Sequence, residues 1–224
     1  MSRLVLMMFA ILVGFVPSFA AAQNAKPDPW EKDISKYEED DKKSPPPKDP
    51  VVFVGSSTIR LWNLPKSFPG MAVINRGFGG SKYADIPRFV KRIITNYKPR
   101  AIVMYSGDND LAGNKSPEQV AADFAEVVKG VRAELPETPI YVFGVKPSIA
   151  RWKLVDKGRE ANRLIEAQCQ AGKHMTFLSV EKLMLGDDGM PRAELFVKDG
   201  LHMSAEGYKL WSELLLPKIK VEEK

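Results

Sequence analysis

The chain has few of the residues that define several common protein classes. Its single cysteine, Cys169, excludes an internal disulfide, so the fold has to rest on its hydrophobic core. Cys169 lies in a helical pattern with no histidine nearby, which favours a small buried side chain over a nucleophile. Only two histidines are present, and one of them, His174, lies in a setting typical of a surface or strand-edge residue. The composition, 44% hydrophobic and 27% charged, is that of an ordinary globular protein.

Long apolar runs are also scarce. The run from Leu4 to Val16 is shorter than the roughly 20 residues that a membrane-spanning helix needs, which argues against a membrane anchor. Arg3 precedes this run and Ala20-Ala21-Ala22 follows it, which is the pattern of a cleavable secretory signal peptide. No cysteine follows the run, so a lipid anchor is disfavoured. We therefore expect residues 1–22 to be removed and the mature protein to be secreted or periplasmic, without stable membrane insertion.

The charge of the chain does not indicate a nucleic-acid partner. The formal net charge is only +5, and no block of lysine and arginine is interleaved with aromatic residues. A charge of this size predicts no more than a mild attraction to acidic surfaces.

Residues 23–50 differ in composition from the rest of the chain, because they are polar and rich in proline. Within them, Trp30, Ile34 and Tyr37 recur at helical spacing. This pattern predicts a short amphipathic helix that docks on the main domain, followed by a stiff linker. A disordered leader is the alternative. The main domain is predicted to occupy residues 51–224.

From residue 51 onward, short apolar runs alternate with helical patterns. The predicted strands are Val51–Val54, Met71–Ile74, Ala101–Tyr105, Ile140–Phe143 and Met175–Leu178. The predicted helices are Asp85–Asn96, Pro117–Leu135, Lys157–Ala171 and Ser204–Leu216. Continuous apolar strands that alternate with helices are typical of a parallel sheet covered on both faces.

Polar and glycine-rich segments follow the predicted strands, where functional groups gather in such sheets. They are Gly55-Ser56-Ser57-Thr58 after the first strand, Asn75 to Gly80 after the second, Ser106 to Asp110 after the third, and Asp199-Gly200-Leu201-His202 after the fifth strand and a long loop. We expect all four segments to converge on one edge of the sheet.

Together these segments supply what acyl transfer needs. Asp199, three residues before His202, can hold the Nδ1 atom of the imidazole and leave the other nitrogen as a general base. A serine at a strand-to-helix turn is exposed, and its own N–H is one donor to a developing oxyanion. A glycine-rich turn and an asparagine side chain supply further donors. Each segment alone is a weak signal, because it is also compatible with a turn, a phosphate cradle or a cation site.

As an ordered set, the segments resemble the sequence blocks of the SGNH (GDSL-type) ester hydrolases. The resemblance places the nucleophile at Ser57, oxyanion donors at Gly80 and Asn109, and the Asp-x-x-His block at Asp199 and His202. It implies a three-layer α/β/α, flavodoxin-like fold with five parallel strands.

The resemblance extends from Val51 to Leu216, and one departure from the family's first block matters. Ser56 and Thr58 stand where the family usually has aspartate and leucine, so the attacking serine is Ser57 by block position, with Ser56 as the alternative. Asp108 and Asp110 flank Asn109, and Arg76 lies in the glycine-rich segment; we interpret all three as loop packing and hydrogen bonding, with substrate contact as the alternative. Trp152 is interpreted as a pocket wall or a core residue.

The function that the resemblance implies is a serine ester hydrolase that works through an acyl-enzyme, without metal or organic cofactor, and the signal-peptide pattern adds the expectation that it is exported. The expected substrates are esters such as acetylated carbohydrates or lysophospholipids, and the lack of a long apolar lid segment favours small acyl groups. One alternative is a catalytically inactive envelope- or carbohydrate-binding domain of the same fold. Another is a nucleotide or phosphate binder that uses the turn at residues 77–80, which leaves the pair Asp199 and His202 unexplained.

Overall fold

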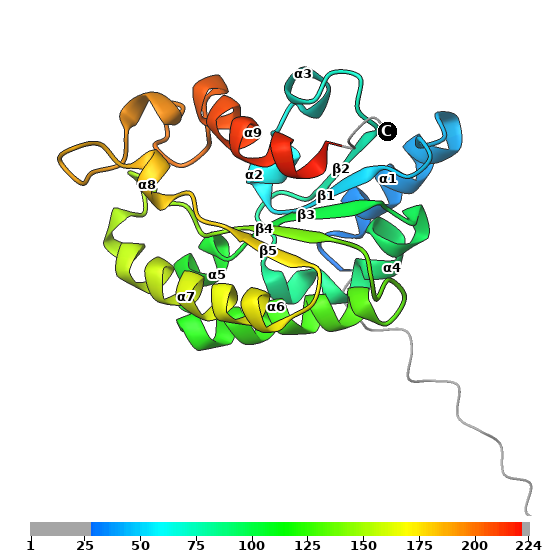
Figure 1. Cartoon of the computed structure of the whole chain (residues 1–224), viewed down its shortest axis with the longest axis horizontal. Coiled ribbons are helices and arrows are strands. Elements are labelled where there is room, and N and C mark those ends of the chain that lie inside the picture. The colour runs from blue at the N-terminus through cyan, green and yellow to red at the C-terminus, as the bar shows by residue number, and fades with distance from the viewer. Residues whose placement is uncertain (1–27, 221–224) are drawn as a thin grey trace, which may run out of the picture.

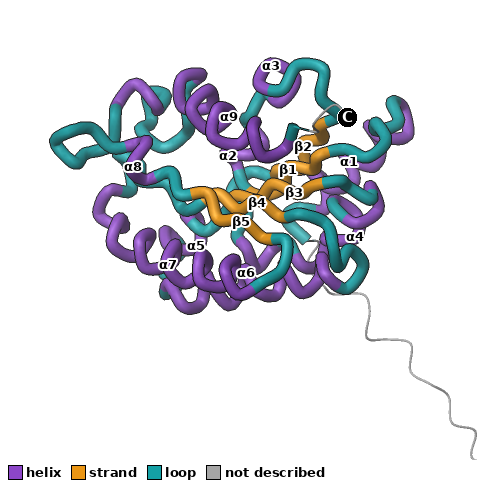
Figure 2. Tube along the Cα trace, in the orientation of Figure 1, coloured by secondary structure: helices purple, strands orange, loops and turns teal. Residues whose placement is uncertain are grey.

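At the centre of the molecule lies a sheet of parallel strands in the order β2-β1-β3-β4-β5, seen in a computed structural model that describes residues 28–220. The strands are β1 (Val51–Gly55), β2 (Val73–Gly77), β3 (Ala101–Tyr105), β4 (Ile140–Phe143) and β5 (Met175–Leu178). Helices cover both faces of the sheet, so the predicted three-layer α/β/α fold with five parallel strands is confirmed (Figures 1 and 2). The signal peptide predicted for residues 1–22 lies outside the described residues.

The order of the strands reverses between β1 and β3, because the chain runs from β1 to one side and then returns to the other. In open parallel sheets, ligands bind outside the carboxyl ends of the strands at such a reversal. The topology therefore directs attention to the loops that follow β1, β2 and β3.

The helices form two layers with separate apolar cores. They are α1 (Glu31–Lys43), α2 (Ser57–Arg60), α3 (Leu64–Ser67), α4 (Val90–Ile93), α5 (Asp108–Ala112), α6 (Pro117–Arg132), α7 (Val155–Ala171), α8 (Glu181–Met184) and α9 (Ala205–Ile219). Alternate strand residues face the two cores, so that Phe53 of β1 packs with α9 and its neighbour Val54 packs with α6 and α7. On the α9 side, Trp211 stacks on Phe143 with ring centroids 4.3 Å apart.

Two predicted elements differ in the structure. Strand β2 begins at Val73, which pairs with Val51, and this register carries the strand on to Gly77 rather than ending it at Ile74. The predicted helix Asp85–Asn96 is wrong, since the segment forms short 3₁₀ turns around the four-residue α4. Pro87 lies within it and has no N–H to continue a helical hydrogen-bond ladder. Buried side chains such as Ile86 then hold the separate turns against the core.

The helix predicted from Trp30, Ile34 and Tyr37 is present as α1, and it packs against the domain (Figure 1). The Ile34 side chain is fully buried, and the Tyr37 hydroxyl donates to the carbonyl oxygen of Gly77 at the end of β2. Arg92 binds Glu31 and Glu38 of α1 at 2.8 and 2.7 Å. Helix α1 is thus part of the folded domain, on the side of β2. Within residues 28–220, no helix is long and apolar enough to cross a membrane.

Candidate active site

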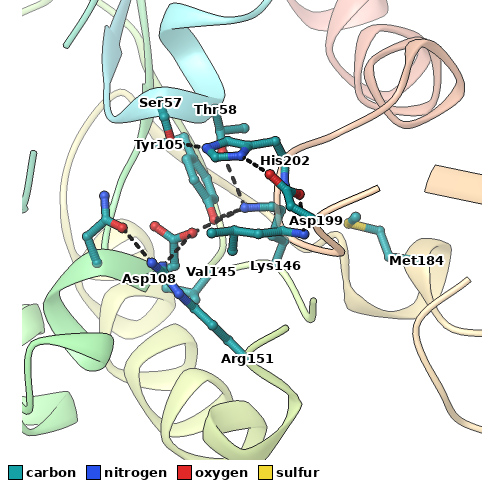
Figure 3. A network of polar contacts seen from close by, with 12 residues as sticks. Ser57, Thr58, Tyr105, Asp108, Val145, Lys146, Arg151, Met184, Asp199 and His202 are labelled. Atoms are coloured by element: carbon teal, nitrogen blue, oxygen red, sulfur yellow. Dashed lines mark hydrogen bonds and ion pairs between the residues drawn. The ribbon is translucent and has the colours of Figure 1, made fainter. Parts of the chain in front are cut away.

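Ser57, His202 and Asp199 form a hydrogen-bonded row at the carboxyl edge of the sheet (Figure 3). The Oγ atom of Ser57 lies 3.1 Å from Nε2 of His202, and Nδ1 of His202 lies 2.6 Å from Oδ2 of Asp199. Ser57 is the first residue of α2, directly after β1, whereas the other two residues precede α9. A contact between residues 145 positions apart is therefore made by the fold.

The turn that contains Asp199 and His202 is fixed by the aspartate itself. Oδ1 of Asp199 accepts the N–H groups of Leu201 at 2.8 Å and His202 at 2.9 Å, while Gly200 adopts a φ of +64°. The hydrogen bond from His202 and these two N–H groups lower the pKa of Asp199 to about 2. An ionised Asp199 keeps the proton of the imidazole on Nδ1, so Nε2 faces Ser57 as an acceptor.

The two adjacent serines after β1 lie in different environments. Gly55 has a φ of +145°, and a Cβ atom there would lie 1.8 Å from the carbonyl oxygen of Tyr105, so the turn out of β1 requires glycine. After this turn, the side chain of Ser56 is fully buried and its hydroxyl has no hydrogen-bond partner among the described residues. Ser57, in contrast, faces His202. Of the two serines, the geometry therefore joins Ser57 to the imidazole.

Asn109 and the loop containing Gly80 meet beside this row. Nδ2 of Asn109 donates to the carbonyl oxygen of Ser81 at 3.0 Å, and the Ser81 hydroxyl donates to the carbonyl oxygen of Gly55 at 3.3 Å. Gly80 has a φ of +79°, a conformation that favours glycine. These contacts bring the loops after β1, β2 and β3 together, with Asn109 fixed next to the glycine turn.

A buried lysine that sequence reasoning missed lies behind the row. Nζ of Lys146 donates to Thr58 Oγ1 at 3.2 Å, to Tyr105 Oη at 3.0 Å and to Asp108 Oδ2 at 3.2 Å. Its side chain is only 1% exposed. Burial lowers the pKa of Lys146, and the carboxylate of Asp108 partly offsets this effect. The position of Lys146 three residues after β4 was the available signal, because that places it at the functional edge.

The other charged residues of these loops have structural partners. Asp110 accepts the N–H of Tyr83 at 3.2 Å, and Arg76 lies in β2, where it binds Asp41 of α1 at 2.5 Å. Asp108 binds Lys146 as described, so all three serve packing and hydrogen bonding within the protein. Outside the site, His174 binds Glu137 at 2.9 Å on the surface.

The described residues form no cluster of three or more histidine, cysteine or acidic side chains suited to holding a metal ion. An open groove of about 620 Å³ lies between α3 and α9, and the three residues of the row are not among those that line it. Met203, which follows His202, lines it together with Leu61, which follows α2, and Val197. The side chains of Leu61 and Val197 are exposed. The arrangement thus offers a hydroxyl beside a base, fixed N–H donors and an adjoining apolar surface.

Comparison with known proteins identifies a family and several solved structures to which this chain is similar. The sequence model described as "GDSL-like Lipase/Acylhydrolase family" matches residues 60–210. This range contains Gly80, Asn109, Asp199 and His202, and it begins just after Ser57. A search of curated proteins finds no match.

Several solved structures share the fold at low sequence identity. A GDSL-like lipase from Bacteroides thetaiotaomicron is 21% identical, with a TM-score of 0.69 over 83% of this chain and 96% of its own. A protein from Streptococcus pneumonia, provisionally named a platelet activating factor, is 20% identical, with a TM-score of 0.76 over 85% of this chain and 92% of its own. A family 3 carbohydrate esterase from Clostridium thermocellum is 16% identical, with a TM-score of 0.59 over 76% of this chain and 94% of its own.

Proposed function

Because the chain belongs to the GDSL-like lipase/acylhydrolase family, we propose that it is a serine ester hydrolase in which Ser57 forms an acyl-enzyme. The observation that carries the proposal is the row of hydrogen bonds from Ser57 to His202 at 3.1 Å and from His202 to Asp199 at 2.6 Å. A hydroxyl, a base and a carboxylate that orients the base are the three parts of nucleophilic acyl transfer.

In the first half of the reaction, Oγ of Ser57 attacks the ester carbonyl carbon while its proton passes to Nε2 of His202. The carbonyl oxygen becomes a negatively charged oxyanion. When the tetrahedral intermediate collapses, the bond to the alkoxide breaks and His202 returns the proton to the leaving alcohol. In the second half, His202 takes a proton from water, and the resulting hydroxide attacks the acyl carbon. The bond from that carbon to Oγ of Ser57 then breaks, the carboxylic acid leaves, and His202 returns the proton to Oγ.

The oxyanion is held by three donors: the N–H of Ser57, the N–H of Gly80 and Nδ2 of Asn109. The first N–H groups of a helix have no acceptor within the helix, and Ser57 begins α2. Nδ2 of Asn109 carries two hydrogens, of which Ser81 accepts one, so the second is available to substrate. Removing one donor of this kind typically costs about 10²- to 10³-fold in kcat.

The substrate classes that we propose are acetylated carbohydrates and lysophospholipids. The apolar groove lined by Leu61, Val197 and Met203 supports esters with a longer acyl chain. The absence of a long apolar lid segment in the sequence favours small acyl groups. A series of p-nitrophenyl esters from acetate to dodecanoate separates the two, because kcat/KM rises with chain length only if the groove binds the chain.

The test of the activity compares the two adjacent serines. We expect Ser57→Ala to lower kcat for p-nitrophenyl acetate by about 10³-fold or more, and Ser56→Ala to leave most of the activity. A larger loss in Ser56→Ala would assign the nucleophile to Ser56. Wild-type rates no higher than those of Ser57→Ala would instead support a catalytically inactive binding domain.

We further propose that the protein is exported and that residues 1–22 are its signal peptide, on the basis of the apolar run between Leu4 and Val16. The expected mature protein begins at Gln23 and is found outside the cytoplasm. Intact-mass measurement of protein recovered from the periplasm and the medium checks this. Recovery of the full-length chain from the cytoplasm alone would contradict it.

A further inference from the structure

A buried cluster of three charged side chains lies behind the proposed oxyanion site (Figure 3). Lys146 and Arg151 reach the carboxylate of Asp108 from the segment after β4, with Nζ of Lys146 at 3.2 Å and Nη1 of Arg151 at 3.3 Å from the same Oδ2. The Asp108 side chain is 10% exposed. Two cations therefore share one carboxylate at the edge of the sheet.

The carboxylate of this cluster is ionised. Burial raises the pKa of Asp108, but Lys146 and then Arg151 outweigh that effect and hold its pKa below the ordinary value. A buried carboxylate between two cations fixes both of them in place, since leaving a charge buried without its partner is costly.

Arg151 connects the cluster to Asn109. While Nη1 faces Asp108, Nη2 donates to Oδ1 of Asn109 at 3.0 Å. The planar guanidinium suits this use, because its nitrogens point in fixed directions: Nη2 makes a hydrogen bond to Asn109, whereas Nη1 makes an ion pair with Asp108 without a hydrogen bond. On the other side of the amide, Nδ2 of Asn109 donates to the carbonyl oxygen of Ser81 at 3.0 Å. Both ends of the amide are thus held, and rotation of the amide by half a turn would break both contacts.

The orientation of this amide matters for the reaction. With Nδ2 toward the substrate, Asn109 donates to the oxyanion, whereas a rotated amide would present Oδ1 and repel it. The positive charge of Arg151 beside Oδ1 of Asn109 also draws electron density from Nδ2–H and makes it a stronger donor. Both effects grow as charge develops on the substrate oxygen, so they act on the transition state more than on the bound ester.

We propose that Arg151 is a positioning residue for ester hydrolysis, which acts through Asn109 by orienting and polarising its amide. The proposal rests on the proposed function, because it assumes that Asn109 donates to the oxyanion. Asp108 and Lys146 hold the guanidinium in place from behind. The Arg151 side chain is 23% exposed, so the alternative to be tested is direct contact between Arg151 and an anionic group of the substrate.

The first test compares two substitutions of Arg151 with one of Arg159 in α7. Arg151→Met is expected to lower kcat for p-nitrophenyl acetate by about 10- to 100-fold, the effect of losing a hydrogen bond from a charged group, with KM changed less than about twofold. Arg151→Lys is expected to lose less than Arg151→Met because it keeps the charge. Arg159→Met is the matched control: Arg159 lines a small cavity of about 20 Å³ together with Arg151, but it binds Asp156 and Glu181. Its kcat is expected to match the wild type.

A double-mutant cycle with Asn109→Ala decides whether Arg151 acts through the asparagine. In the Asn109→Ala background, Arg151→Met is expected to cost less than about twofold further, because the amide it orients is gone. An undiminished 10-fold or larger loss in that background overturns the proposal. So does a change confined to KM that appears only with anionic esters, which would indicate direct substrate contact.

Two controls keep the outcome unambiguous. If Arg151→Met does not fold, as judged by circular dichroism and thermal unfolding, the cycle is run with Arg151→Lys. A kcat equal to that of the wild type in Arg151→Lys would show that the guanidinium group is not needed to orient the Asn109 amide, and would overturn the proposal. The baseline is Ser57→Ala. If the wild type shows no hydrolysis above that baseline, the proposed function fails. If it does and the cycle is additive, only the role of Arg151 fails.

Discussion

Two groups of side chains, each built around a carboxylate, lie at the same edge of the sheet, and they are built in opposite ways. Asp199 and His202 are three residues apart in one turn, and the Asp199 side chain is 48% exposed. Asp108, Lys146 and Arg151 come from the ends of β3 and β4 and are largely buried. In both groups a carboxylate has a lowered pKa, in the first because hydrogen bonds hold it and in the second because two cations outweigh burial.

This difference in burial predicts which group affects mainly turnover and which affects mainly the free energy of unfolding. An exposed pair loses little solvation on folding and contributes little to the folding free energy. A buried cluster has already lost its solvation, so each of its members depends on the others. We therefore expect substitutions in the first group to affect mainly turnover, and substitutions of Lys146 and Asp108 to affect mainly the free energy of unfolding.

The largest expected effect is on turnover, in Asp199→Asn. An amide at this position accepts a hydrogen bond from Nδ1–H less strongly than a carboxylate and allows the wrong tautomer of His202, so kcat should fall by about 10⁴-fold. The free energy of unfolding in urea should change by less than about 1 kcal/mol. Steady-state kinetics and urea unfolding of the same preparation check both. A loss of less than about tenfold in kcat would show that the carboxylate does not orient the base.

The next effect is on stability, in Lys146→Met. Removing the lysine leaves the carboxylate of Asp108 with Arg151 alone, and breaking a buried ion pair costs about 3–5 kcal/mol. Because Arg151 remains, we expect the lower end, about 3 kcal/mol by urea unfolding. Lys153→Met, an exposed lysine on the same segment, is the matched control and should change stability by less than about 0.5 kcal/mol. An equal loss of unfolding free energy in Lys146→Met and Lys153→Met would contradict the claim that the buried cluster stabilises the fold.

The two groups also differ in how far the sequence predicts them. Asp199 and His202 are recognisable because their interaction is local, and Ser57 because a serine after a buried strand points to the same edge. Asn109 and Gly80 are predicted in the same way, because they lie in polar or glycine-rich segments that follow predicted strands. The burial of Lys146 has no local signal in the sequence, since it depends on Tyr105 at the end of β3 and on Asp108 at the start of α5.

Secondary-structure elements whose bounds depend on contacts with residues far away in the sequence are likewise predicted less well, because the local pattern does not show those contacts. The strands β1, β3, β4 and β5 are short apolar runs, and each lies within a residue of where the run predicts it. Strand β2 extends through polar residues because Asn75 binds the carbonyl oxygens of Ile59 and Trp62 with its side chain, at 2.7 and 3.2 Å. Such partners are not visible in the local pattern.

A smaller effect is expected inside the buried cluster, in Tyr105→Phe. Lys146 donates to Oη of Tyr105 at 3.0 Å, and losing this acceptor leaves one of its N–H groups without a partner. We expect a loss of about 1–1.5 kcal/mol, or about 2–6 °C in Tm. Tyr141→Phe is the control, because the Tyr141 hydroxyl donates to the carbonyl oxygen of Lys218 at the surface, where water can take the place of the lost hydroxyl. A larger loss in Tyr141→Phe would count against the burial argument.

The smallest effect is the contribution of the Asp199 carboxylate to stability in acid. Its pKa is lowered from 3.8 to about 2, so its contribution is fully present above pH 3.8 and is lost as the pH falls toward 2. Solvent screening of this exposed group keeps the contribution below about 1 kcal/mol. Urea unfolding of the wild type and Asp199→Asn at pH 5, 4, 3 and 2.5 should show the difference between them shrinking only below pH 4. Asp187→Asn, an exposed carboxylate in another loop, serves as the control. A difference that grows as the pH falls would mean that the carboxylate is not held in the folded state as its hydrogen bonds indicate.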